Sequence, residues 1–302
     1  MPAKNRIILT APPKLCVYDP DAMCDTFEFF NEMLNQAVLN RNRTHLDLSN
    51  VKKMTAGAAL RLFAEVSAAQ MATKMGEIIT VTAPSAPHLA NRFVDTGLTA
   101  ALKPGTVGKL QRLWATDSDF KSGTNPADCI IPTREILKRN HQTPPEPLIT
   151  AISEAMLNTT QHAYREYEQV QSELEGRWWQ YCFVHDNMLN FLISDFGLGV
   201  PESLRKNSVM PDAAPLLTQP IMEDKDLIAY AMKKGVSRLG GRGRGQGSED
   251  MKRPALRSND NLLIISGNGQ YLFSAGDDVP QLKTLPFSIR GTFIEWSLEM
   301  SQ

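Results

Sequence analysis

The stretch of sequence that decides the fold is LITAISEAMLNTTQHAY, which runs from Leu148 to Tyr164. Its apolar positions recur at helical spacing and form one stripe that a protein core would bury. The residues of that stripe are Ile152, Ala155, Met156, Thr159 and Ala163. Glu154, Asn158 and His162 are spaced four apart, so they lie along the opposite face and point the same way. The pattern predicts an amphipathic helix with a Glu–Asn–His face.

A carboxylate and a carboxamide one turn apart can present oxygens to a hydrated Mg²⁺ or hold a water for attack on a phosphate. A polar face of this kind is also the ordinary solvent side of an amphipathic helix. The helix alone therefore does not indicate a function. The motifs that follow it in the sequence distinguish between these two interpretations.

Three motifs follow the helix in order. The apolar run Phe191–Ser194 leads into DFGLG at 195–199, and a glycine-rich segment, GRGRGQG, occupies 241–247. Near the end, the stretch from Arg290 to Leu298 reads RGTFIEWSL and predicts a final strand. The chain thus carries, in order, a helix with E-x-x-x-N, a D-x-G-x-G turn, a glycine loop and a G-T strand, and this combination is more specific than any one of the motifs.

This order of motifs resembles the GHKL superfamily, which contains the gyrase B, MutL and heat-shock chaperone ATPases, the sensor histidine kinases and the anti-sigma-factor kinases. The resemblance covers Pro145–Leu298, about half of the chain. It implies a Bergerat-type α/β sandwich that binds ATP and Mg²⁺. Asn158 matches the Mg²⁺ ligand, and Glu154 matches the carboxylate that orients or deprotonates the attacking group. His162 falls near the phosphates in this comparison, and it reads equally well as a surface histidine.

Asp195 is expected at the end of a buried strand, where a ligand can enter. Its carboxylate only accepts hydrogen bonds, so it favours the exocyclic amine of adenine over the carbonyl of guanine, by about 1–3 kcal/mol. Gly197 and Gly199 let the backbone approach the base. Thr292 matches the strand threonine that lies beside the adenine in the superfamily. An ordinary D-x-G turn is the alternative for this motif.

The glycine-rich segment is expected to bind the phosphates. Its backbone N–H groups can turn toward phosphate oxygens, and a helix that begins near Ser248 would add its positive end. Arg242 and Arg244 could pair with phosphates. The residues assigned to this segment are Arg242, Gly243, Arg244, Gly245, Gln246 and Gly247. The alternative, an Arg-Gly nucleic-acid segment, is disfavoured because the stretch is short and lacks stacking aromatics.

The first third of the chain alternates strands with helices, which predicts parallel pairing through helical crossovers. The expected strands are 6–9, 15–18, 44–48 and 77–82, and the expected helices are 21–39, 55–73 and 87–96. His45–Leu62 is similar to the signature of STAS domains, the anti-sigma-factor antagonist fold. Ala56 stands where regulated members carry an acceptor serine, so only Thr55 or Ser49 could be modified, and a generic βα turn is the alternative.

The expected organisation is a STAS-like regulatory or interaction domain at 1–110, a proline-rich spacer at 111–147 that includes a short helix at 130–139, and the ATP-binding domain at 148–302. In that last domain we expect hairpins at 178–194 and 262–274, a helix at 226–234, and one helical layer over a mixed sheet. The fold class is therefore α/β for both domains.

Composition bounds the class of protein. The chain has 302 residues, a formal net charge of -1 and four scattered cysteines. No global charge favours nucleic acid, no segment reads as a membrane span or signal peptide, and the cysteines predict reduced thiols in a cytoplasm. The pairing of the two domain types implies a bacterial source.

The predicted function is Mg²⁺-dependent ATP binding with slow hydrolysis that drives a conformational or partner-binding switch. An anti-sigma-type or histidine-kinase-like phosphotransferase and a non-catalytic ATP-gated interaction module are the alternatives. A protein partner and a homodimer are expected from the resemblance.

Overall fold

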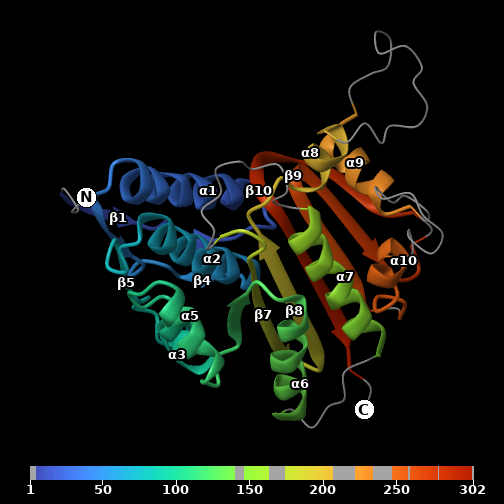
Figure 1. Cartoon of the computed structure of the whole chain (residues 1–302), viewed down its shortest axis with the longest axis horizontal. Coiled ribbons are helices and arrows are strands. Elements are labelled where there is room, and N and C mark those ends of the chain that lie inside the picture. The colour runs from blue at the N-terminus through green and yellow to red at the C-terminus, as the bar shows by residue number, and fades with distance from the viewer. Residues whose placement is uncertain are drawn as a thin grey trace. The chain divides into compact units, whose positions relative to one another are not determined.

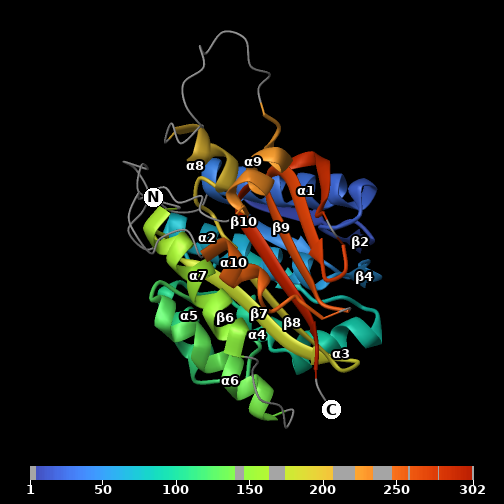
Figure 2. The ribbon, with the colours of Figure 1, turned by 90° about the vertical axis from the view of Figure 1, so that its right-hand side faces the viewer.

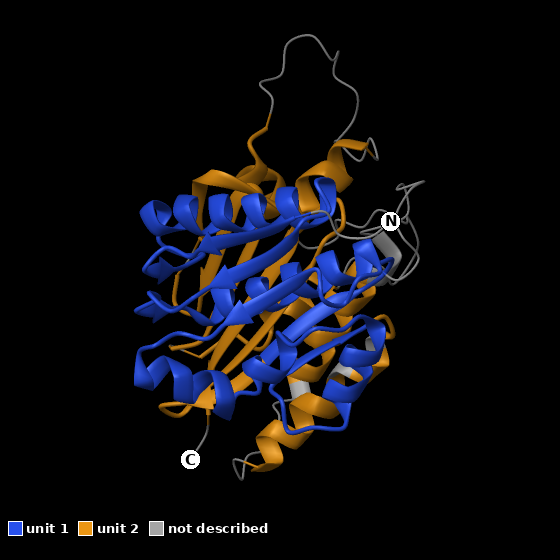
Figure 3. Cartoon of the chain, turned by 90° about the vertical axis from the view of Figure 1, so that its left-hand side faces the viewer, with its two compact units in different colours: residues 1–123, 168–181 blue, residues 124–167, 182–302 orange. Residues whose placement is uncertain are grey.

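The structure is a computed structural model of the chain, and it describes residues 5–139, 146–162, 174–206, 222–233, 247–257, 259–277 and 279–300. The protein is a mixed α/β protein with several sheets. The chain forms two compact units, coloured separately in Figure 3. Unit 1 contains residues 1–123 and 168–181, and unit 2 contains residues 124–167 and 182–302.

Unit 1 is built on a parallel sheet whose strand order is β1-β3-β5. The strands are β1 (Arg6–Thr10), β3 (Arg43–Asp47) and β5 (Ile79–Thr82), and the helices that alternate with them are α1 (Pro20–Leu34), α2 (Ala56–Thr73) and α3 (Pro87–Asp95), as Figure 1 shows. The alternation of strand and helix predicted this parallel pairing, and the structure confirms it. The smaller elements are a π-helix (Asn35–Leu39), the paired strands β2 (Lys14–Leu15) and β4 (Lys53–Met54), α4 (Leu98–Ala101), α5 (Val107–Trp114) and β6 (Phe120–Gly123).

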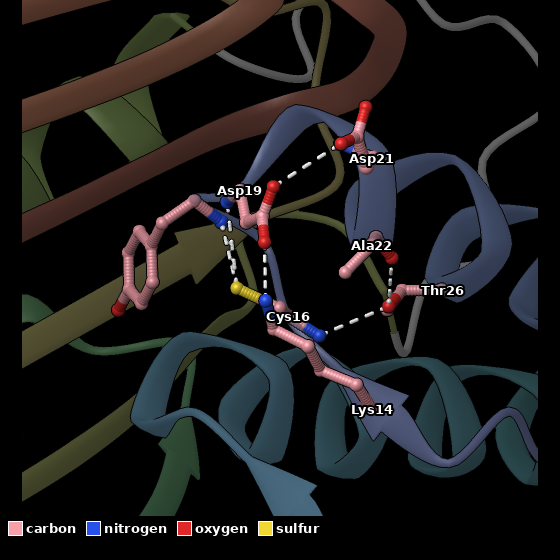
Figure 4. A network of polar contacts seen from close by, with 7 residues as sticks. Lys14, Cys16, Asp19, Asp21, Ala22 and Thr26 are labelled. Carbon is pink, nitrogen blue, oxygen red and sulfur yellow. Dashed lines mark hydrogen bonds and ion pairs between the residues drawn. The ribbon is translucent and has the colours of Figure 1, made fainter.

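The expected strand at 15–18 is wrong beyond its first residue, because the chain turns there into α1. The backbone N–H groups of Tyr18 and Asp19 both donate to Sγ of Cys16 at 3.4 Å (Figure 4). Asp19 caps the helix by accepting from the N–H of Asp21, and the N–H of Cys16 donates to Oγ1 of Thr26 at 2.9 Å. These bonds use donors that a strand would have paired in a sheet.

Helix α2 is buried along almost its whole circumference, and it is the central helix of unit 1. Thr55, one of the two hydroxyls considered for modification, is its N-cap and accepts from the N–H of Ala58 at 3.3 Å. Within the helix, Arg61 donates to Glu65 at 2.6 Å, and both side chains are almost fully buried. The STAS-like turn is therefore a capped helix start in this structure.

Unit 2 is built on a sheet in which the strand order is β7-β8-β10-β9. These strands are β7 (Trp178–His185), β8 (Met188–Asp195), β10 (Gln281–Glu299) and β9 (Asn261–Ser274). The helices of this unit are a 3₁₀ turn (Pro126–Cys129), α6 (Ile130–Arg139), α7 (Glu146–His162), α8 (Val200–Lys206), α9 (Asp224–Ala231) and α10 (Gly247–Lys252). Strand β7 is shared, because its residues up to Tyr181 pair with β6 inside unit 1 and its residues from Cys182 belong to unit 2.

Helix α7 lies over one face of the unit 2 sheet, and α10 packs beside it (Figures 1 and 2). Its predicted apolar stripe is buried where it is described: Ile152, Ala155, Met156 and Thr159 each expose 4% or less. Strands β7 and β8 form the predicted hairpin, and Asp186 and Asn187 both have positive φ, as a type I′ turn requires. The helix predicted from Leu148 and this hairpin are confirmed.

The expected mixed sheet is wrong for the described strands, because β10 pairs antiparallel with both β8 and β9. The expected hairpin at 262–274 is also wrong. Gly267, Asn268 and Gly269 lie inside the single continuous strand β9, which pairs with β10 along both of its halves with a shift of register between them. A Cβ at Gly269 would lie 2.4 Å from the backbone nitrogen of Lys225, so these glycines let α9 approach the strand instead of turning the chain.

The segment 111–147, expected to be a spacer, contains the end of α5, strand β6, the 3₁₀ turn and α6. The short helix predicted at Ile130–Arg139 is confirmed. Thr133, Ile136 and Leu137 are buried on that helix, so this part of the segment belongs to a packed structure despite its prolines.

Candidate functional site

The loop that follows β8 holds its polar groups in place through a short chain of hydrogen bonds. We call residues 195–200 the Asp195 loop. Asp195 is the last residue of β8, exposes 5% of its surface, and accepts from the N–H of Gly197 through Oδ1 at 2.7 Å. Gly199 has φ +80°, a conformation that glycine adopts without strain. The buried carboxylate predicted at a strand end is therefore present.

Ser266 of β9 joins this loop to the next strands. Its Oγ donates to the carbonyl of Gly291 and accepts from the N–H of Val200, each at 2.9 Å. It lies 3.5 Å from Oγ1 of Thr292. Ser266 is fully buried, so these bonds satisfy a hydroxyl that would otherwise be costly to bury. Thr292, a predicted site residue, is thus brought to the Asp195 loop.

Gly291 and Arg290 complete the contact from β10. Gly291 has φ +79°, and a Cβ there would lie 2.1 Å from the carbonyl oxygen of Asp195 and 2.9 Å from its Oδ1. Arg290 donates through Nε to the carbonyl of Phe196 at 3.0 Å. Only glycine fits at position 291, because both the space and the backbone conformation exclude a side chain.

The second group of predicted residues meets where α7 packs against α10, and we call Glu154, Gly247 and Asp250 the α7–α10 contact. A Cβ added to Gly247 would lie 2.7 Å from Oε2 of Glu154. Glu154 is half-buried, and burial followed by the charge of Asp250 raises the pKa of its carboxyl. The contact therefore places a carboxylate of raised proton affinity at the end of the glycine-rich segment.

The other two predicted site residues of α7 are Asn158 and His162, and only the side chain of Asn158 is described. Asn158 is exposed and follows Glu154 by one turn, so its carboxamide can reach a ligand from solvent. His162 is the last residue of α7, and its side chain lies outside the described part of the chain. Among the described residues, no group of three or more His, Cys, Asp or Glu side chains could hold a metal ion.

Helix α10, which begins at Gly247, is bonded to the residues that follow α9. Ser248 donates through Oγ to the carbonyl of Lys233 at 3.2 Å, and Lys252 donates through Nζ to the carbonyl of Met232 at 2.8 Å. Trp296 holds α10 on β10 by donating to the carbonyl of Met251 at 2.8 Å. The predicted residues Arg242, Gly243, Arg244, Gly245 and Gln246 lie outside the described residues.

Sequence reasoning missed Ser266 and the role of Arg290. Ser266 precedes Gly267, Asn268 and Gly269, a sequence that predicts a turn, and a serine before a turn carries no signal of its own. Arg290 lies at the start of the predicted strand 290–298, where an arginine carries none either. Both act on residues far away in the sequence, and local spacing does not reveal such contacts.

The Asp195 loop and the α7–α10 contact each offer polar groups that a ligand could use. An ionised carboxylate has room for about four hydrogen bonds, so Asp195 can accept from a base amine in addition to Gly197. Mg²⁺ is commonly bound by one or two side chains together with phosphates and waters, and Asn158 with Glu154 could supply that share.

No protein-family model matches this sequence, and no curated protein sequence matches it significantly. No described helix is long and apolar enough to cross a membrane.

Proposed function

We propose that unit 2 is a Mg²⁺-dependent ATP-binding domain with slow hydrolysis, and that nucleotide binding switches the conformation or partner binding of the protein. The observation that carries the proposal is the buried carboxylate of Asp195, which the neighbouring contacts of Ser266, Arg290 and Gly291 surround with a fixed backbone. The GHKL-like order of motifs supplies the remaining support.

Asp195 recognises the base. A buried carboxylate accepts a hydrogen bond from the amine of adenine, whereas the carbonyl of guanine would leave both groups unpaired at a cost of about 1–3 kcal/mol. Thr292, beside Ser266, adds a hydroxyl that can hold the base directly or through a water. The expected result is preference for ATP over GTP.

Glu154 and Asn158 act on the phosphates. Asn158 would hold a bound Mg²⁺ through its carboxamide oxygen, and the ion would supply positive charge against the phosphates. Glu154 orients or deprotonates the attacking water. Its raised proton affinity suits a general base, because a base works best when its pKa lies closer to the working pH.

The test follows γ-labelled ATP with Mg²⁺ in the wild type, in Asp195→Asn and in Asp186→Asn. Asp186 offers a matched control, because the same substitution is made there in a hairpin turn where the side chain is 85% exposed. We expect free labelled phosphate from the wild type and the control, and at least about tenfold weaker ATP binding in Asp195→Asn.

Label on the protein itself would replace hydrolysis by autophosphorylation, with Thr55 and Ser49 as the first acceptors to examine. ATP that binds and stays intact would leave a nucleotide-gated interaction module. Equal ATP binding by Asp195→Asn and the wild type would overturn the assignment of Asp195 to the base.

A further inference from the structure

A second set of contacts holds the far end of α8, the helix that continues from the Asp195 loop. Arg205, near the end of α8, donates to Oδ1 of Asp224 at 2.6 Å, and it also donates to the carbonyl of Met222 at 3.3 Å. The side chain of Asp224 is 14% exposed and that of Arg205 is 36% exposed. The pair is thus partly shielded from water, which strengthens it relative to a fully exposed pair.

Asp224 is also bonded to strand β9. Its Oδ2 accepts from the N–H of Asn268 at 2.9 Å. A Cβ at Gly267 would lie 2.0 Å from the same oxygen, so the glycine is what allows the carboxylate to reach the strand. Gly267 has φ +58° and follows Ser266 directly. Two nearby residues of β9 therefore hold two different segments: Asn268 bonds to Asp224, and Ser266 bonds to the Asp195 loop.

Helix α8 is consequently fixed to β9 at both ends. Its start is held by the bond between the N–H of Val200 and Ser266, and its end is held through Arg205 and Asp224 to Asn268. A helix of seven residues has little stability of its own, so these tertiary bonds decide where it lies. Moving α8 would move Gly199 and the residues that follow Asp195.

We propose that Asp224 and Arg205 are positioning residues for the Asp195 loop, and that they act by clamping α8 to β9. This role for the base-recognition end of the site rests on the proposed function of Asp195. The neighbouring ion pair between Lys225 and Glu223 has a different role, since the Glu223 carboxylate accepts from Thr284 of β10 and so holds α9 to that strand.

The experiment compares Arg205→Met, Asp224→Ala and the control Glu223→Gln with the wild type in two measurements. The first is amide hydrogen exchange of a peptide that covers residues 195–206. We expect exchange at least about tenfold faster in Arg205→Met and Asp224→Ala, and wild-type exchange in Glu223→Gln. Unchanged exchange in both clamp variants would overturn the proposal, whatever they bind.

The second measurement is the affinity for adenosine and, separately, for tripolyphosphate with Mg²⁺. A positioning role predicts about five- to tenfold weaker adenosine binding in the clamp variants and unchanged tripolyphosphate binding. A uniform loss for both probes would indicate general damage and overturn the positioning role. Faster exchange in a protein whose wild type binds no adenosine would sustain the clamp and overturn the proposed function.

Discussion

The Asp195 loop and the α7–α10 contact of unit 2 differ in how their polar groups are held. In the loop, the carbonyls of Phe196 and Gly291 and the N–H groups of Gly197 and Val200 all have partners in the described structure. At the α7–α10 contact, Glu154 faces a second carboxylate, and Asn158 is exposed. The backbone of the Asp195 loop is therefore fixed by its own hydrogen bonds, whereas the α7–α10 contact brings two carboxylates near each other.

The largest effect is expected from a substitution that disrupts the Asp195 loop. Gly291→Ala should destabilise unit 2 by about 2–5 kcal/mol, because left-handed strain of about 1–2 kcal/mol adds to overpacking of about 1–3 kcal/mol against Asp195. Gly276 is the control, since it also has positive φ but has nothing within 4 Å of its would-be Cβ. Gly276→Ala should cost only the strain. Denaturant unfolding measures both, and equal losses would mean that the contact with Asp195 is not tight.

The next prediction concerns Glu154 of the α7–α10 contact, the proposed general base. Glu154→Gln should lower the rate of ATP hydrolysis by about 10²–10⁴-fold, since it removes a general base, while ATP affinity changes little. Single-turnover hydrolysis and equilibrium binding separate the two quantities. Glu202→Gln, an exposed carboxylate on α8, serves as the control. A parallel loss of affinity and rate in Glu154→Gln would make Glu154 a binding group instead of a base.

A smaller effect is expected at Ser266, which links β9 to Gly291 of β10 and to Val200. Ser266→Ala should weaken adenosine binding by about five- to thirtyfold, or roughly 1–2 kcal/mol, because the N–H of Val200 and the carbonyl of Gly291 lose their shared partner. Ser274, a half-buried serine of the same strand whose hydroxyl donates to Oδ1 of Asn261 at 2.6 Å, gives the matched control Ser274→Ala, because this bond involves none of the residues of the Asp195 loop. Calorimetry measures the affinities. Identical affinities in both variants would place the base elsewhere.

The smallest expected effect is a pH dependence of stability at the α7–α10 contact. Because the pKa of Glu154 is raised above its ordinary value of about 4.5, the folded protein binds more protons than the unfolded chain between these two values. Stability contributed by protonated Glu154 is present below the ordinary value and is lost as the pH rises through the raised one. Asp250→Asn removes one cause of the raised pKa. As the pH rises from the ordinary to the raised pKa of Glu154, the thermal midpoint of this variant should therefore fall less than that of the wild type. Asp186→Asn should behave as the wild type.

Much of this fold follows from local sequence patterns. The βα alternation predicted the parallel sheet of unit 1, the spacing at Leu148–Tyr164 predicted α7, and the Asp186-Asn187 pair predicted a hairpin. The same local reasoning failed at Gly267–Gly269, because glycine serves turns and close backbone approaches alike. What occupies the space beside a glycine, here α9, is fixed by tertiary packing that the local pattern does not contain.

The candidate site also contains residues that local sequence predicts and residues that it does not. Asp195 could be placed at a strand end from the apolar run before it, and the structure has it there. Ser266, Arg205 and Asp224 could not be found, because they bond to residues that are 19 to 66 positions away. A single serine, arginine or aspartate between ordinary elements has no periodicity that marks it.

Strand β7 has a consequence for synthesis of the chain. Among the described strands, β6 pairs only with β7, and the chain makes Thr124–Tyr167 of unit 2 between them. A ribosome that adds about 5–20 residues per second needs about 3–12 s to pass from Gly123 to Tyr181. During that time the nascent chain carries β6 without its partner strand. The pairing of β6 with β7 therefore forms seconds after β6 is synthesised, so the last step that completes this pair waits for the synthesis of residues from unit 2.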